Sequence, residues 1–232
     1  MAADTTTPEE HTDYQELAEL MDSRAQTDGL LARIYRVEAD QDLLDEMRGM
    51  RFPTATGNPH VDEGYKLLYT YLKGIWDDSV TELAIDYVNT FIGHGVNAFS
   101  AAYPFESVHT SERRLLMQEA RDEVLAIYRA NHLKKGKWKQ SEDHIALELE
   151  FMQVMSKRSA DALRAGNEDE AVNLIATQYN FLEDHLINWV PMLVSDMLKH
   201  AKTDFYRGAA ELTLGFLESD EEVLRDLLEE DE

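Results

Sequence analysis

The spacing of apolar side chains is the feature that most limits what this chain can fold into. Apolar residues recur three or four positions apart through most of the 232 residues, which places them on one face of an α-helix. The alternating apolar and polar pattern of a half-buried β-strand is essentially absent. Glycine and proline, which interrupt helices, number only 11 and 5. The sequence therefore predicts an all-α fold.

The same spacing predicts where the individual helices lie. The expected ranges are 13–37, 40–49, 61–74, 78–92, 112–132, a helix capped by Ser141, 168–187, 189–201 and 203–218. Gly93 is expected to end the helix before it, because glycine tolerates the left-handed turn beyond a helix end. The segment 93–110 is expected to be a loop. In the helix that follows this loop, Leu115 and Leu116 are expected to face inward.

The chain shows no internal repeat and no linker rich in glycine, serine or proline. Hydrophobic residues make up 44% of the sequence, which is enough to fill a core and argues against general disorder. We therefore expect a single helical-bundle domain of about nine or ten helices over residues 13–218. Residues 1–12 are expected to form a disordered N-terminal tail, and residues 219–232 an acidic C-terminal tail.

Composition narrows the classes of partner and compartment. Acidic residues outnumber basic ones by 46 to 22, and the formal charge of −24 repels nucleic acid and anionic lipid while attracting cationic partners. The absence of cysteine excludes disulfides, thiolate metal sites and a cysteine nucleophile. The sequence shows neither an export signal nor a stretch of about eighteen apolar residues. A cytoplasmic protein without stable membrane insertion is expected.

The sequence carries no recognisable catalytic motif. It contains no glycine-rich phosphate loop after a strand, no G-x-S-x-G elbow and no H-E-x-x-H pair. His144 and Glu148 are four positions apart on a predicted helix, so that one metal ion could touch both. Two ligands without a third do not make a convincing site. We therefore expect no enzyme, no metal site and no cofactor, and keep a small helical metalloenzyme as the least favoured alternative.

The run 140–144, with the sequence Gln-Ser-Glu-Asp-His, lies where a loop enters a helix. A serine followed by acidic residues is ordinary at a helix start, because the hydroxyl caps the helix and acids suit its positive end. That explanation does not cover His144, which is mildly unfavourable beside a positive helix end. Asp143 and His144 together can accept and donate hydrogen bonds, so the pair could hold a bound partner.

The surroundings of this pair contain further motifs. The run 83–93 is a tyrosine-containing helix that ends in an aromatic residue, an apolar residue and glycine. The run 103–109 places a proline, an aromatic residue and a serine before the next helix. Additional elements are His-Leu-x-x-Trp at 185–189, Phe-Tyr-Arg at 205–207 and Leu-Leu-Ala-Arg-Ile-Tyr at 30–35.

These motifs, in this order, resemble the TorD/DmsD family of molybdoenzyme maturation chaperones. The likeness runs from about residue 14 to residue 217. Asp143 and His144 match the Asp and His of that family's E-P-x-D-H signature. Gln140 and Ser141 depart from it, because they replace the usual glutamate and proline.

The resemblance implies a cytoplasmic, non-catalytic chaperone. Such proteins bind the twin-arginine signal peptide and/or the apo-form of a molybdopterin-dependent oxidoreductase, and assist cofactor insertion and proofreading before export. They occur as monomers or homodimers. An accessory protein that binds only the mature catalytic subunit is the alternative. The sequence does not name the client reductase.

A twin-arginine peptide would need carboxylates for its guanidinium groups and an adaptable apolar groove for its hydrophobic segment. Asp143 is expected either to bind a guanidinium or to fix His144, which would supply a directional hydrogen bond. For the aromatic candidates, packing in the core explains the spacing as well as a groove does. The candidate peptide-binding residues are Asp143, His144, Gln140, Tyr87, Phe91, Phe105, Ser107 and Tyr35.

Overall fold

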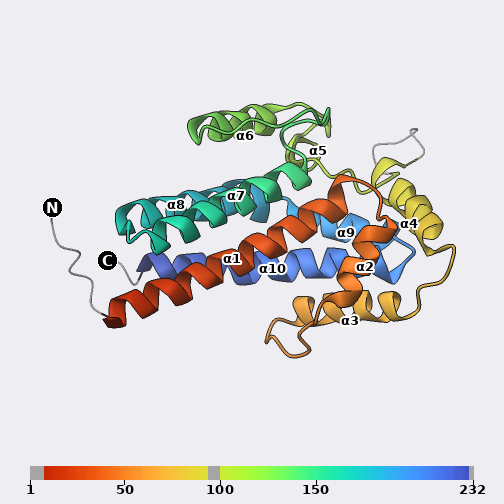
Figure 1. Ribbon diagram of the computed structural model, residues 1–232. Coiled ribbons are helices and arrows are strands. Elements are labelled where there is room, and N and C mark those ends of the chain that lie inside the picture. Colours follow the sequence, from red (N-terminus) through yellow and green to blue (C-terminus); the bar gives the residue numbers. More distant parts are fainter. Residues whose placement is uncertain (1–7, 94–99, 230–232) are drawn as a thin grey trace.

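The computed structural model describes residues 8–93 and 100–229, and within them the chain is all-helical (Figure 1). In this part of the chain, the strand-like pairing is limited to one isolated antiparallel bridge between Phe105 and His144. The predicted all-α, single-domain class is confirmed. The α-helices are α1 (Pro8–Arg36), α2 (Gln41–Gly49), α3 (Pro59–Lys73), α4 (Ser79–Tyr87), α5 (Glu106–Thr110), α6 (Glu119–Ala130), α7 (Ile145–Arg164), α8 (Glu168–Phe181), α9 (Val190–His200) and α10 (Asp204–Glu229). Two π-helical segments, η1 (Val88–Ile92) and η2 (Leu182–Ile187), extend α4 and α8.

Long helices packed side by side form the body of the molecule. The helix α1 packs along α7, which packs against α8, while α10 packs along α3. In Figure 1, α1 runs diagonally below α7 and α8 and crosses α10. The short helix α5 and α6 lie at the top of the view, and α4 lies at its right-hand edge. None of the described helices is both long and apolar enough to span a bilayer.

Glycines allow α3 and α10 to approach closely. A Cβ atom on Gly64 would lie 2.6 Å from the backbone nitrogen of Leu212, and one on Gly208 would lie 2.9 Å from the carbonyl oxygen of Gly64. A third glycine, Gly215, meets the backbone of α3 in the same way, at Val61. Side chains at these positions would force the two helices apart, because protein interiors have no spare room at such distances.

A buried polar network ties α1 to α8 and α10. Arg24 makes two parallel bonds to Asp220, with Nε–Oδ1 at 2.5 Å and Nη2–Oδ2 at 2.8 Å, and donates to Gln178 at 2.7 Å. Asp28 is buried beside this network, and neither of its carboxylate oxygens has a hydrogen-bond partner among the described residues. Burial, reinforced by the charge of Asp220, raises the pKa of Asp28 well above its ordinary value.

Both ends of the domain differ from the predicted boundaries. The helix α10 continues to Glu229, beyond the predicted end at 218, because Asp220 and Leu224 face the core and hold this part of the helix in place. At the other end α1 begins at Pro8, inside the segment predicted as a tail. Residues 1–7 and 230–232 of the two predicted tails lie outside the described residues.

The prediction of a loop over 93–110 and a helix over 112–132 was partly wrong in the described residues, which do not include 94–99. Residues Glu106–Thr110 form α5, and the next helix begins only at Glu119. Arg114 and Met117 have φ values of 48° and 57°, and a right-handed helix cannot pass through this left-handed conformation. Leu115 and Leu116 consequently point outward, with 43% and 49% of their surface exposed. Gly93 ends η1 as predicted, with a φ value of 66°.

Candidate functional site

The Asp143–His144 pair lies where the chain before α7 meets the chain before α5. The backbone N–H of Glu106 donates to the carbonyl oxygen of Asp143 at 3.0 Å, beside the bridge between Phe105 and His144. Two segments almost forty residues apart are thereby fixed to each other. The motifs at 103–109 and 140–144 are thereby brought together.

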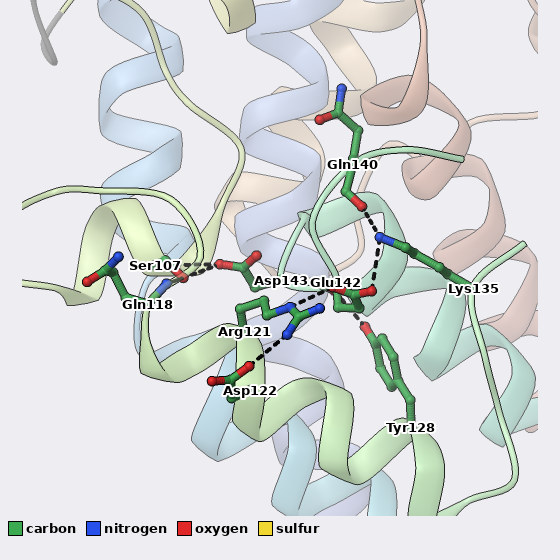
Figure 2. A network of polar contacts seen from close by, with 9 residues as sticks. All are labelled: Ser107, Gln118, Arg121, Asp122, Tyr128, Lys135, Gln140, Glu142 and Asp143. Carbon is green, nitrogen blue, oxygen red and sulfur yellow. Dashed lines mark hydrogen bonds and ion pairs between the residues drawn. The ribbon is translucent and has the colours of Figure 1, made fainter. Parts of the chain in front are cut away.

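The carboxylate of Asp143 organises the start of α5. Its Oδ2 atom accepts hydrogen bonds from the backbone N–H of Ser107, at 3.0 Å, and from the hydroxyl of Ser107 (Figure 2). That hydroxyl oxygen in turn accepts the N–H of Gln118 at 3.1 Å, just before α6 begins. Asp143 is fully buried, so it is not placed to meet an arginine from outside. It instead positions α5 and the entry to α6.

His144 caps α7, which Ser141 was expected to do. Its Nδ1 atom accepts the N–H of Ala146 at 3.1 Å, so the neutral ring carries its proton on Nε2. Burial, together with the positive charge of Arg36, lowers the pKa of His144 to about 3. A neutral acceptor suits the positive end of a helix, which resolves why a histidine stands at this position.

Two aromatic rings enclose the imidazole of His144. The rings of Phe105 and Trp138 each lie edge-on to it, with centroids 4.8 Å away. The guanidinium of Arg36 lies over the indole ring of Trp138, 5.0 Å from its centroid. Neither Trp138 nor Arg36 belongs to the motifs that the sequence analysis singled out.

Glu142 joins the same junction to α6. Its carboxylate pairs with Arg121 at 2.7 Å and with Lys135 at 2.9 Å (Figure 2). Burial opposes its ionisation, but the hydrogen bonds from Lys135 and Arg121 outweigh burial and lower the pKa of Glu142. Lys135 also donates to the carbonyl oxygen of Gln140, whose side chain is exposed.

The remaining candidate aromatics form a separate cluster in the core. Tyr35 and Tyr87 contact Phe91 with ring centroids 5.7 and 5.0 Å apart, and Phe91 meets Tyr206 at 5.7 Å. Tyr87 also donates to the carbonyl oxygen of Tyr35 at 2.9 Å. All four side chains are buried, which suits the core-packing alternative. Contact between these rings and a peptide stays a prediction.

Several buried acidic residues near Asp143 were not expected from the sequence. Glu106 lies 3.2 Å from Nδ1 of His185, and Glu148 accepts the indole N–H of Trp189 at 3.2 Å. Burial, and then the nearby Glu106 and Asp143 carboxylates, raise the pKa of Glu148 well above its ordinary value. In the described part of the chain, no three His, Asp or Glu side chains gather in a way that could hold a metal ion.

The outer side of this junction is a cleft of about 760 Å³ between α5, α6 and the η2–α9 region, which we call the acidic cleft. No lysine or arginine is among the described residues that line it. Met192 lines the cleft, and residues 115–117 lie between its lining residues Glu112 and Gln118; we call the exposed apolar side chains of these two segments the apolar ridge. The carboxylates of the cleft are Glu106, Glu112, Glu119, Glu123 and Asp184. The apolar ridge consists of Leu115, Leu116, Met117 and Met192, with 43%, 49%, 68% and 40% of their surface exposed.

Comparison with known proteins places the chain in a family. Residues 58–195 match the model of the nitrate reductase delta subunit family. The chain belongs to this family. It is 24% identical to chaperone protein TorD of Aliivibrio fischeri over 219 residues, covering 90% of this chain and 98% of that protein. TorD of Photobacterium profundum is 26% identical over 145 residues, covering 62% of this chain and 64% of that protein. The predicted resemblance to TorD chaperones is confirmed, and it supports a chaperone of molybdoenzyme maturation.

The segment that matches this family contains most of the candidate site. It spans α3 to the first half of α9 and therefore includes the Asp143–His144 junction, the acidic cleft and the apolar ridge. Tyr35 on α1 lies outside it. The two long partners in the core, α1 and α10, also lie outside it. The family match thus coincides with the part of the fold where the polar junction lies.

Proposed function

We propose that this chain is a cytoplasmic chaperone that binds the twin-arginine signal peptide of a molybdopterin-dependent oxidoreductase. It would also hold the apo-form of that enzyme, assist insertion of the cofactor and delay export until insertion is complete. The observation that carries the proposal is the acidic cleft beside the apolar ridge. Both features are built on the junction that Asp143 and His144 hold.

The cleft has the chemistry that a twin-arginine peptide requires. Each guanidinium group pairs best with a carboxylate, through two parallel hydrogen bonds. Glu112, Glu119 and Glu123 are exposed at the cleft. Among the described residues that line it, no lysine or arginine competes with a peptide for them. The apolar segment that follows the arginines in a leader would lie on the ridge, where methionine side chains adapt to different sequences.

We assign positioning roles to the buried members of the predicted site. Asp143 fixes Ser107, and through it Gln118, so that α5 and α6 keep the cleft open at its present width. His144 anchors α7 and holds Phe105 from the other side of the junction. The core rings of Tyr35, Tyr87 and Phe91 would support this region from within, while exposed Gln140 could add a polar contact.

The decisive experiment measures binding of a fluorescent peptide that carries a twin-arginine leader sequence. The double variant Glu119→Gln/Glu123→Gln removes two exposed carboxylates one turn apart on α6. We expect binding to weaken about 10-fold, since exposed ion pairs contribute roughly 0.2–1 kcal/mol each. The matched control is Asp42→Asn/Glu46→Gln, which makes the same change one turn apart on α2 and should leave binding within about 2-fold of wild type.

Asp143→Ala and His144→Ala test the junction itself. Both should weaken leader binding while circular dichroism shows unchanged helicity. Binding equal to wild type in both variants would remove the pair from the site. A client enzyme that binds equally well after its leader is deleted would favour the alternative, an accessory protein for the mature catalytic subunit.

A further inference from the structure

A second surface with binding chemistry lies at the start of α4, away from the acidic cleft. In Figure 1, α4 lies at the right-hand edge, whereas α6 lies at the top. A pocket of about 760 Å³ opens there between α4, the turn before it and the start of α10, and we call it the α4 pocket. The lining residues that carry the argument are Tyr71, Trp76, Asp78, Glu82, Ile85 and Asp204.

Large apolar side chains are exposed in this pocket. Trp76 has 57% of its surface exposed and Ile85 has 60%. The backbone that presents Trp76 is held in place, because its N–H donates to the hydroxyl oxygen of Ser79 at 2.9 Å and its carbonyl oxygen accepts the N–H of Ser79 at 3.0 Å. A tryptophan held this way on a surface is typical of a contact that a partner buries.

Carboxylates surround the exposed tryptophan. Glu82 accepts the hydroxyl of Tyr71 at 2.9 Å, which fixes its orientation toward the pocket wall. Asp78 stands at the N-cap position of α4 but makes no cap hydrogen bond, so capping does not occupy its carboxylate. Asp204 adds a third negative charge, and Lys202 is the one lysine or arginine among the described residues that line the pocket.

A fourth carboxylate in the pocket has a structural role instead. Asp86 accepts the backbone N–H of Lys202 at 2.9 Å, the backbone N–H of Thr203 at 2.7 Å and the hydroxyl of Thr203 at 2.7 Å. It therefore fixes the start of α10 against α4. The floor of the pocket is rigid, while Asp78 and Glu82 remain at its exposed rim.

We propose that the α4 pocket is a docking site for a partner-protein segment that carries an arginine or lysine beside aliphatic side chains. The cation would lie over the indole of Trp76 and pair with Glu82 or Asp78, since tryptophan is the best aromatic partner for a cation. The aliphatic side chains would pack on Ile85. A second copy of this chain fits poorly, because two molecules of charge −24 repel each other at an acidic face. The proposal does not depend on leader binding, since the acidic cleft shares no lining residue with this pocket.

The test uses a labelled helical peptide of alanine, leucine and arginine as the probe, titrated with the full chain and followed by fluorescence anisotropy. The double variant Trp76→Ala/Glu82→Gln should weaken binding about 10-fold or more. The matched control is Tyr69→Ala/Glu63→Gln on α3, where Tyr69 is also 57% exposed but lies outside the pocket. The control should bind the probe like wild type, and a peptide with glutamate in place of arginine should not bind.

Three outcomes would overturn the proposal. Equal weakening in both double variants would show that the probe responds to the overall negative charge. Binding unchanged by Trp76→Ala/Glu82→Gln would remove the pocket from recognition. Sedimentation that finds a wild-type dimer and a monomeric Trp76→Ala/Glu82→Gln variant would identify a second copy as the occupant. Circular dichroism of both double variants must match wild type. That is the expected result, because Tyr69, Trp76 and Glu82 are exposed and Glu63 is partly exposed.

Discussion

Replacing Gly64 by alanine should destabilise the protein, although alanine is the better helix former. Gly64 lies in the middle of α3, where α10 passes closest to it. The new Cβ atom would lie 2.6 Å from the backbone nitrogen of Leu212 and 2.8 Å from its Cα and Cβ atoms. Backbone atoms cannot rotate away as the end of a side chain can. The two helices must therefore separate by about 0.8 Å to restore an ordinary contact of 3.4 Å.

The magnitude follows from two opposing effects. Alanine in a helix interior gains about 1 kcal/mol over glycine. Overpacking a filled interior costs roughly 1–3 kcal/mol, and the rigid obstacle at Leu212 favours the upper end of that range. A separation of the helices also weakens dispersion contacts along α3 and α10. We expect the free energy of unfolding to fall by about 2 kcal/mol.

Urea unfolding followed by circular dichroism measures this change, and the chain provides a control of opposite sign. Gly49 is the last residue of α2, and a Cβ atom there would meet nothing within 4 Å. Gly49→Ala should therefore leave stability unchanged or raise it by about 0.5 kcal/mol. If Gly64→Ala proves as stable as Gly49→Ala, the close approach of α3 and α10 is not what requires glycine.

Three further predictions concern single charged or titrating groups. The pKa of Asp28 is raised in the folded state, so Asp28 lowers the free energy of unfolding as pH rises from about 4. Asp28→Asn should therefore stabilise the protein at pH 7 by about 1 kcal/mol or more and flatten the pH dependence of urea unfolding. With a pKa of about 3, His144 should remain neutral from pH 8 to pH 5 in ring-nitrogen NMR spectra. Its contribution to stability should fall as pH falls from about 6.5 toward 3. A ring that titrates near pH 6.5 would contradict its buried position. Arg121→Ala should lower the free energy of unfolding in urea by at most about 1 kcal/mol, because the side chain that pairs with Glu142 is 30% exposed. The loss should be smaller at high salt. A loss of stability that does not depend on salt would count against an ion-pair contribution.

Local periodicity was enough to predict the fold class. Helix ranges such as 40–49 and 189–201 agree closely with α2 and α9, because each depends mainly on residues within its own few turns. The prediction over 112–132 was wrong at its start, where Leu115 and Leu116 keep helical spacing but the backbone leaves the helix at Arg114. Spacing alone cannot show that an apolar run will stay on the surface.

The prediction of the site had a similar limit. The sequence brought attention to Asp143, Ser107 and His144, and the structure does bring these three together. It did not predict that they would be buried, or that His144 would cap α7. The acidic cleft gathers residues from α5, α6, η2 and α9, so no continuous stretch of sequence could have shown it.

The sequence by itself determined that this chain is all-α and carries the motifs of its family, because helical periodicity and short motifs are written in neighbouring residues. The tertiary structure decided which polar groups are buried and which apolar groups are exposed. Glu148 and Asp28 look like surface acids in the sequence, yet distant helices enclose them. Gly64 looks like a weak point of a helix, yet α10 requires it. Burial depends on what packs against a residue from elsewhere in the chain, and only the folded arrangement of helices supplies that information.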